Sequence, residues 1–205
     1  MTSPSEPQDD SAAEGDAVRR RLLEAAALLI DEDGPDALTA RRLAKAAGTS
    51  TMAVYTHFGG MPALVREIVA EGFTRLEEHQ GRVPRTDDPM ADLLALSMAY
   101  RENAMANPHL YAVMFGATSL KGFTLTDADM AIGLASFATL TEFVSRAMDA
   151  GHLRREDPAR VAAQVWTAMH GYVMLELAGL HLSRGNPVEH VMLPLLANLV
   201  AGLAP

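Results

Sequence analysis

Hydroxyl, phenol, imidazole and cationic side chains gather in one short stretch, residues 38–64 of this 205-residue chain. Such groups donate hydrogen bonds to phosphate oxygens, and small polar or apolar side chains on a helix can contact base edges in a groove. The combination indicates recognition of a nucleic-acid duplex. The residues that we expect to make these contacts are Thr39, Arg42, Thr49, Ser50, Thr51, Met52, Tyr55 and His57.

The same stretch predicts two short helices joined by a tight turn. Thr39 precedes an apolar helical run and can cap its first turn. Gly48 follows the run, where a residue without Cβ easily takes a left-handed conformation, and the hydroxyls of residues 49–51 can cap a second helix. A turn of three or four residues results. This is the layout of a helix-turn-helix, whose second helix enters the DNA major groove.

The second helix has distinct faces. If Val54 and Phe58, four residues apart, face the core, then Thr51, Met52 and Tyr55 point elsewhere and can meet a groove. The competing interpretation is a bundle whose helix-turn-helix packs only against itself, since two helices with a tight turn are common. The aromatic and polar residues on the free face favour the DNA-binding interpretation.

At these positions the chain resembles the TetR family of bacterial transcriptional repressors. It departs from the family pattern at Met61-Pro62, where Lys-Glu is usual, and at Met52-Ala53, where Gly followed by Thr or Ser is usual. The missing lysine removes one expected phosphate contact, whereas Pro suits the first turn of the next helix. The matching residues are Thr39, Leu43, Ala44, Ala47, Gly48, Ser50, Tyr55, His57, Phe58 and Leu64.

Composition and charge fit a helical regulator. The 49% hydrophobic content can fill a core, and the absence of cysteine excludes disulfides and thiolate nucleophiles. The net charge is −9, but residues 1–16, 17–66 and 67–205 carry −5, +2 and −6, so only the expected DNA-binding end is positive. Because this end offers few cations per subunit, we expect two subunits on one palindromic double-stranded operator.

We predict an all-α fold. An acidic tail over 1–15 is expected to be disordered, a three-helix DNA-binding domain to span 16–62, and a ligand-binding and dimerisation domain to span 63–205. Arg19-Arg20-Arg21 begins the first helix, and these arginines either contact phosphate or remain solvated. That helix is expected to end at 33–35, and the fourth to span 61–80. Later helices are predicted at 89–106, 108–116, 127–150, 158–184 and 187–203.

The last two predicted helices suggest a homodimer interface. The 158–184 segment is apolar almost all round, so it must be covered on two sides, by its own subunit and by a partner. The 187–203 segment is expected to lie beside it, and Pro194 to kink it or shift its start. From the 187–203 segment we expect Val188, Val191, Leu195 and Leu199 to contribute.

Two further motifs resemble those in the regulatory domains of one TetR subgroup. They are Asn107-Pro108-x-x-Tyr111-x-x-Met114-Phe115 and Trp166-x-x-x-His170-Gly171. The resemblance implies a small-molecule effector that moves the fourth helix. Aromatic and methionine side chains suit an apolar ligand, although each also serves as ordinary core, and His170 as a hydrogen-bonded core histidine. The expected lining is Tyr100, Met105, Tyr111, Met114, Phe115, Phe137, Trp166, His170 and Met174.

Nothing in the sequence favours an enzyme. It contains no glycine-rich phosphate loop, no His-x-x-x-His pair and no nucleophile elbow, so we predict no catalytic residue, metal or cofactor. The chain has no apolar run of membrane-spanning length and no secretory pattern at its start, so we expect a cytoplasmic protein. The alternatives are a DNA-binding regulator without a small-molecule effector and, less favoured, a helical enzyme with a triad assembled from distant residues.

Overall fold

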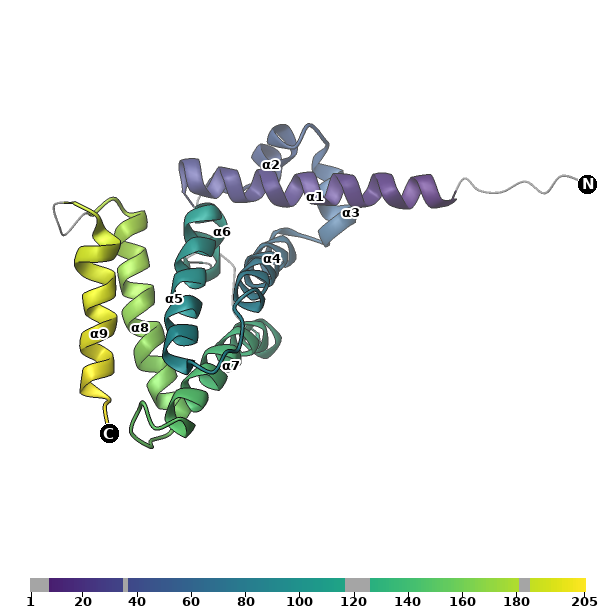
Figure 1. Ribbon diagram of the computed structural model, residues 1–205. Helices are drawn as coiled ribbons and strands as arrows, with labels where there is room; N and C mark the ends of the chain where they lie inside the picture. The colour runs from purple at the N-terminus through teal and green to yellow at the C-terminus, as the bar shows by residue number, and fades with distance from the viewer. Residues whose placement is uncertain (1–7, 35–36, 117–125, 181–184) are drawn as a thin grey trace, which may run out of the picture. The chain divides into compact units, whose positions relative to one another are not determined.

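The computed structural model describes residues 8–34, 37–116, 126–180 and 185–205. Within these ranges the regular structure is helical and contains no strand, which confirms the all-α prediction. In the same residues no helix is both long enough and apolar enough to cross a bilayer. The helices (Figure 1) are α1 (Gln8–Asp33), α2 (Ala40–Ala46), α3 (Thr51–Phe58), α4 (Met61–Gly81), α5 (Pro89–Ala106), α6 (Pro108–Gly116), α7 (Asp127–Asp149), α8 (Pro158–Leu177) and α9 (Leu193–Gly202).

The chain folds into two compact units. Unit 1 contains the described residues up to Gly72 and those of His109–Asp129, and unit 2 contains Phe73–Pro108 with the described residues from Met130 onward. Helix α4 therefore contributes to both units, and α6 belongs with α1 to α3. The contacts divide α4 between Gly72 and Phe73. The boundary between a DNA-binding and a ligand-binding domain, predicted ten residues earlier between 62 and 63, stays a prediction.

In unit 1, helices α1, α2 and α3 pack against one another (Figure 1). Each contributes one completely buried large apolar residue, namely Leu22, Leu43 and Val54. Burying a side chain of this size stabilises a fold by about 1.5–3 kcal/mol. This shared core holds α3 in place while its other face remains outside the core.

The predicted disordered tail is wrong for residues 8–15, because α1 begins at Gln8. The segment contains Ala12, Ala13 and Glu14, which are good helix formers, and the acidic Asp9 and Asp10 suit the positive end of a helix dipole. Composition alone indicated a solvated tail, but these local preferences allow the helix to extend. Residues 1–7 lie outside the described residues.

In unit 2, α8 lies beside α9 and also contacts α5 (Figure 1). The chain enters α9 from the end at which α8 finishes, so the two helices run in opposite directions. Phe143 on α7, Val173 on α8 and Met192 just before α9 are fully buried in the core of this unit. The packing leaves one side of both α8 and α9 exposed.

The last two helices differ from their predicted bounds. Helix α8 ends at Leu177 instead of residue 184, because Gly179 adopts φ 69° and the N–H of Leu180 bonds back to the carbonyl of Leu175, a glycine-dependent C-terminal motif. Residues 181–184 lie outside the described residues. Before α9 the chain forms a π-helical turn over Val188–Met192. The prediction that Pro194 shifts the helix start is confirmed, since a proline cannot donate the regular helical hydrogen bond.

Candidate nucleic-acid interface and regulatory core

The turn between α2 and α3 has the predicted geometry. The Thr39 hydroxyl accepts a hydrogen bond from the Arg42 backbone N–H at 3.3 Å, and the Ser50 hydroxyl accepts one from the Ala53 N–H at 3.1 Å. Gly48 has φ 64°, the left-handed conformation that the sequence predicted. Both hydroxyls therefore serve as helix caps, a role that leaves each with further hydrogen-bonding capacity.

Helix α3 separates its core residues from its free residues as predicted. Val54 and Phe58 are 0% and 8% exposed, whereas Met52 and Tyr55 are 71% and 53% exposed. Thr51 is exposed as well. A large apolar side chain at 71% exposure gains nothing from the core of its own subunit, so the α3 face presents a hydroxyl, a thioether and a phenol outward.

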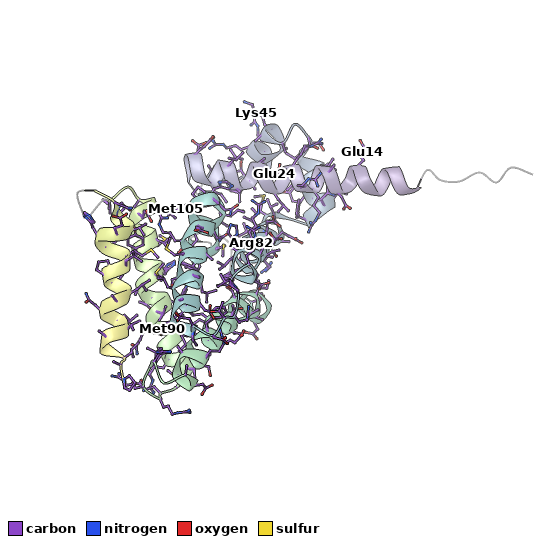
Figure 2. All side chains as sticks on the ribbon, viewed as in Figure 1. Glu14, Glu24, Lys45, Arg82, Met90 and Met105 are labelled. Carbon is purple, nitrogen blue, oxygen red and sulfur yellow. The ribbon has the colours of Figure 1, made fainter. Side chains whose placement is uncertain are left out.

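Two cations that we did not predict also lie on α2. Arg41 and Lys45 are exposed, and Figure 2 shows Lys45 at the outer edge of this helix. Arg42, which we expected at phosphate, forms an exposed ion pair with Asp33. Exposed pairs of this kind are weak, so Arg42 can exchange its partner at little cost. The sequence signal for Arg41 and Lys45 was their helical spacing of four.

The three arginines at 19–21 divide into two roles. The guanidinium of Arg19 forms an ion pair with Glu67 and lies 5.4 Å from the centre of the Phe58 ring. It therefore ties α1 to α3 and α4 by charge and cation–π contact. Arg20 and Arg21 are exposed and keep the alternatives of phosphate contact or solvation.

His57 is half-buried against α1. A Cβ built on Gly15 would lie 3.8 Å from the His57 Cε1 atom, so the ring packs next to this glycine. The contact uses one edge of the ring as packing surface. Its role at phosphate stays a prediction.

In unit 2, four of the nine expected ligand-lining residues form one connected cluster. Tyr100 of α5 accepts a hydrogen bond from Trp166 Nε1 at 3.2 Å, and its hydroxyl lies 3.1 Å from His170 Nδ1. Because an indole N–H only donates, the tyrosine hydroxyl accepts from Trp166 and is free to donate its own O–H hydrogen bond to Nδ1. The Phe137 ring meets the Trp166 ring edge-on at 6.4 Å between centroids.

Burial lowers the pKa of His170 below its ordinary value, which favours the neutral ring. A neutral imidazole accepts at one nitrogen, as the bond with Tyr100 requires. Trp166 is 38% exposed, so the cluster runs from the buried Tyr100 to the surface of α8. The cluster combines apolar ring faces with a chain of hydrogen bonds from Trp166 through Tyr100 to His170.

The other five expected lining residues lie elsewhere on α5 and α8 or on α6. Met105, at the C-terminal end of α5 (Figure 2), and Met174, an exposed residue of α8, lie in the same unit. Tyr111, Met114 and Phe115 lie on α6, in unit 1, because the chain changes helix at Asn107-Pro108. There the rings of Tyr111 and Phe115 are 4.8 Å apart, and Met114 packs so tightly on α4 that a Cβ at Gly72 would approach its Sδ to 2.5 Å.

Sequence reasoning missed an ion pair between α5 and α8. Arg101 donates two hydrogen bonds to Glu176, Nε to Oε2 at 2.8 Å and Nη2 to Oε1 at 2.5 Å, and the two side chains are only 21% and 10% exposed. The hydrogen bonds to Glu176 raise the pKa of Arg101. Tyr172 lies one turn before Glu176. Its hydroxyl is buried without a hydrogen-bond partner of acceptable geometry among the described residues, and burial raises the pKa of Tyr172. No local pattern marks residues 75 positions apart as partners.

A second polar cluster anchors the segment before α5 to α7. Asp92 accepts hydrogen bonds from the Thr86 N–H and hydroxyl, both at 2.7 Å, and from Arg146 at 2.7 Å. Burial opposes the charge of Asp92, but the bonds from Arg146 and Thr86 outweigh it and lower the pKa. Arg85 pairs with Glu142 and lies 4.8 Å from the Phe143 ring centre. This cluster has a structural role.

The exposed sides of α8 and α9 carry mostly small or apolar residues, and their larger polar residues are Gln164 and Asn198. Along the π-helical turn and α9, Met192 and Leu196 are buried, whereas Val188, Val191, Leu195 and Leu199 are half-buried within the subunit. Small exposed residues allow two helices to approach closely. The exposed residues of these sides are Gln164, Thr167, Gly171 and Met174 on α8, and Leu193, Pro194, Ala197, Asn198 and Ala201 on α9.

The capped four-residue turn, the buried Val54 and Phe58 and the outward face of α3 define a helix-turn-helix DNA-binding protein. The chain belongs to the TetR family of bacterial transcriptional regulators: residues 22–68 match the model of bacterial regulatory proteins of the tetR family, and residues 93–199 match that of the tetracyclin repressor-like C-terminal domain. It is thus a TetR-family DNA-binding transcriptional regulator.

Relatives extend over most of the chain. An uncharacterized HTH-type transcriptional regulator of Mycobacterium tuberculosis is 27% identical over 166 residues, covering 78% of this chain and 71% of that protein. The solved structure of a protein with unknown function from Rhodococcus sp. RHA1 is 30% identical, covers 92% of this chain and 96% of its own, and gives a TM-score of 0.77. AibR, solved in complex with isovaleryl coenzyme A and operator DNA, has the same fold at 21% identity, with 92% and 98% coverage and a TM-score of 0.67.

Proposed function

We propose that this regulator is a homodimeric repressor that a small, largely apolar effector releases from a palindromic operator. The observation that carries the DNA-binding part is the α3 face, where Met52 and Tyr55 are exposed while Val54 and Phe58 are buried. In each subunit Thr51 and Met52 face bases. Phosphates are held by Thr39, Tyr55 and His57, together with the exposed cations of α2.

Dimerisation through α8 and α9 is supported by their exposed sides. Leu193 and Met174 are 36% and 43% exposed, and Gly171 and Ala197 next to them are small. Two copies of this surface would form a four-helix interface that buries these apolar groups. Pairing also doubles the number of phosphate contacts, which a unit with few cations needs for affinity at physiological salt.

Effector binding in unit 2 is supported by the Tyr100, Phe137, Trp166 and His170 cluster, which offers ring faces together with polar groups in fixed orientation. AibR, of the same fold, was solved with an acyl coenzyme A and operator DNA together. Moving the dimer from mostly bound to mostly released requires a preference of about 5.5 kcal/mol for the released state. Burying about 200 Å² of apolar ligand surface in the released state alone supplies a preference of that order.

The DNA-binding part is tested with Tyr55→Ala and Tyr55→Phe in shift assays on upstream DNA at fixed salt. Loss of the ring and hydroxyl should weaken binding across DNA sequences, because a phosphate contact carries no sequence information. The phenylalanine variant isolates the hydroxyl. Both proteins should remain dimers by light scattering. Unchanged affinity of Tyr55→Ala would remove Tyr55 from the interface.

The effector part is tested by native mass spectrometry of protein purified without ligand removal, followed by release assays with any molecule found. Trp166→Ala should fold, since Trp166 is partly exposed, but should lose release by that molecule. Leu134→Ala, which shortens an exposed side chain of α7, is the control and should respond as the wild type does. Normal release of Trp166→Ala would move the site elsewhere, and a protein that never carries or answers a ligand favours the regulator without an effector.

A further inference from the structure

Met52 is the large apolar side chain with the highest exposed fraction among those measured in the described residues, at 71%. It occupies the second position of α3, directly after Thr51, in the turn that the Ser50 hydroxyl caps. The cap fixes the start of the helix, so the Met52 side chain leaves the backbone at a defined point. An exposed thioether at this position does not serve the core of its own unit.

The major groove offers one apolar group that such a side chain can recognise. Of the four bases only thymine carries a methyl group there, at C5, and apolar side chains contact it. Methionine is unbranched and polarizable, so its side chain adapts to the shape of a methyl group. Its thioether sulfur is only a weak hydrogen-bond acceptor, so polar base edges do not compete for it. The neighbouring Thr51 and Tyr55 carry hydroxyls and suit phosphate or polar base edges instead.

We propose that Met52 is the specificity-determining residue of α3 and that it selects its base by contact with the 5-methyl group of a thymine, once in each half-site. The inference rests on the proposed entry of α3 into the major groove. The contact would remove most of the Met52 side chain from water on binding. It would thereby convert a surface that is unfavourable in the free protein into affinity for one base.

The test uses the wild-type dimer and a duplex selected from a random pool by that protein. Each thymine is replaced in turn by deoxyuridine, which removes only the methyl group. One symmetric pair of thymines should be sensitive, with affinity falling about fourfold for one replacement and about fifteenfold for both, the effect of losing one buried methyl-sized group per half-site.

The same duplexes are then measured with Met52→Ala, a variant of an exposed residue that should keep its stability. The alanine protein should bind more weakly overall and lose the difference between thymine and uracil at that pair, because the two partners of one contact are coupled. Met52→Gln should instead shift selection toward adenine, whose N6 and N7 atoms pair with an amide. Leu134→Ala should keep the full uracil effect.

Equal uracil sensitivity in wild type and Met52→Ala would overturn the proposal, because the methyl group would then act through another residue or through DNA shape. Insensitivity of every thymine in the wild-type site would overturn it as well. Failure of the proposed function gives a different result, since no duplex would be selected from the pool at all.

Discussion

In unit 1 the hydroxyls that precede α2 and α3 bond to backbone groups three residues away, whereas in unit 2 the polar side chains of α5 and α8 bond to each other across 70 and 75 residues of sequence. The first arrangement fixes helix ends and leaves a face exposed. The second ties two helices together inside the unit. Polar side chains therefore fix helix ends in unit 1 and join two helices in unit 2.

This contrast separates the expected effects of mutation. Substituting an exposed side chain of α3 should change DNA affinity with little effect on folding, because it removes no core contact. Substituting a core residue or an ion-paired residue of unit 2 should change stability first, because it removes packing or leaves a charge without its partner. The following substitutions test that division.

The largest effect is expected from Phe143→Ala in unit 2. Phe143 is fully buried, and the guanidinium of Arg85 lies over its ring. Its removal leaves a cavity and should lower the free energy of unfolding by about 3–5 kcal/mol in denaturant titration. The control, Leu134→Ala, shortens a side chain that is 63% exposed and should stay within about 0.5 kcal/mol. Similar losses in the two variants would contradict the assigned core.

A smaller loss of stability is expected from Glu176→Gln. The substitution keeps the shape but leaves Arg101, which is 21% exposed, without its opposite charge. We expect a loss of about 1–3 kcal/mol in the free energy of unfolding, below that of a fully buried pair because Arg101 keeps some solvent. Asp149→Asn breaks a surface pair with Arg155 at 3.7 Å and should cost almost nothing. Equal losses in the free energy of unfolding for Glu176→Gln and Asp149→Asn would mean that the α5–α8 ion pair stabilises the protein no more than a surface pair does.

The same contrast explains what the sequence could predict. The caps at Thr39 and Ser50, the left-handed Gly48 and the two faces of α3 depend on residues within one or two turns, so spacing alone located them. Helices α5 and α6 have their predicted bounds because Pro89, Asn107 and Pro108 mark their ends.

Unit 2 was predictable only in part because its contacts are long-range. The Tyr100–His170 contact joined two residues that we had selected as aromatic lining, but spacing gave no reason to pair them. Arg101 and Glu176 could not be selected from the sequence, since a charged residue is buried only with a partner that the linear sequence does not reveal. The start of α1 at Gln8 was missed because acidic composition outweighed local helix propensity in our interpretation.

A modest effect is expected at Ser50, where capping and DNA contact can be separated. Ser50→Ala removes the acceptor for the Ala53 N–H and should lower stability by about 1 kcal/mol, read from thermal unfolding. Ser50→Asp keeps an acceptor and should restore stability, but its negative charge should weaken DNA binding if the cap lies near phosphate. Full DNA affinity of the aspartate variant would remove Ser50 from the phosphate contacts.

The smallest effect is expected from His170→Gln and concerns pH. Because burial lowers the pKa of His170 in the folded protein, the unfolded chain takes up its proton at a higher pH. Stability should therefore fall as the pH drops below about 6.5, the ordinary histidine pKa, and should level off below the folded pKa. Glutamine can still accept from Tyr100 but does not titrate, so its unfolding midpoint should lose this part of the pH dependence. Leu134→Ala, which changes an exposed residue of α7 that does not titrate, should keep the wild-type slope, and an unchanged slope in His170→Gln would mean that burial does not hold its ring neutral.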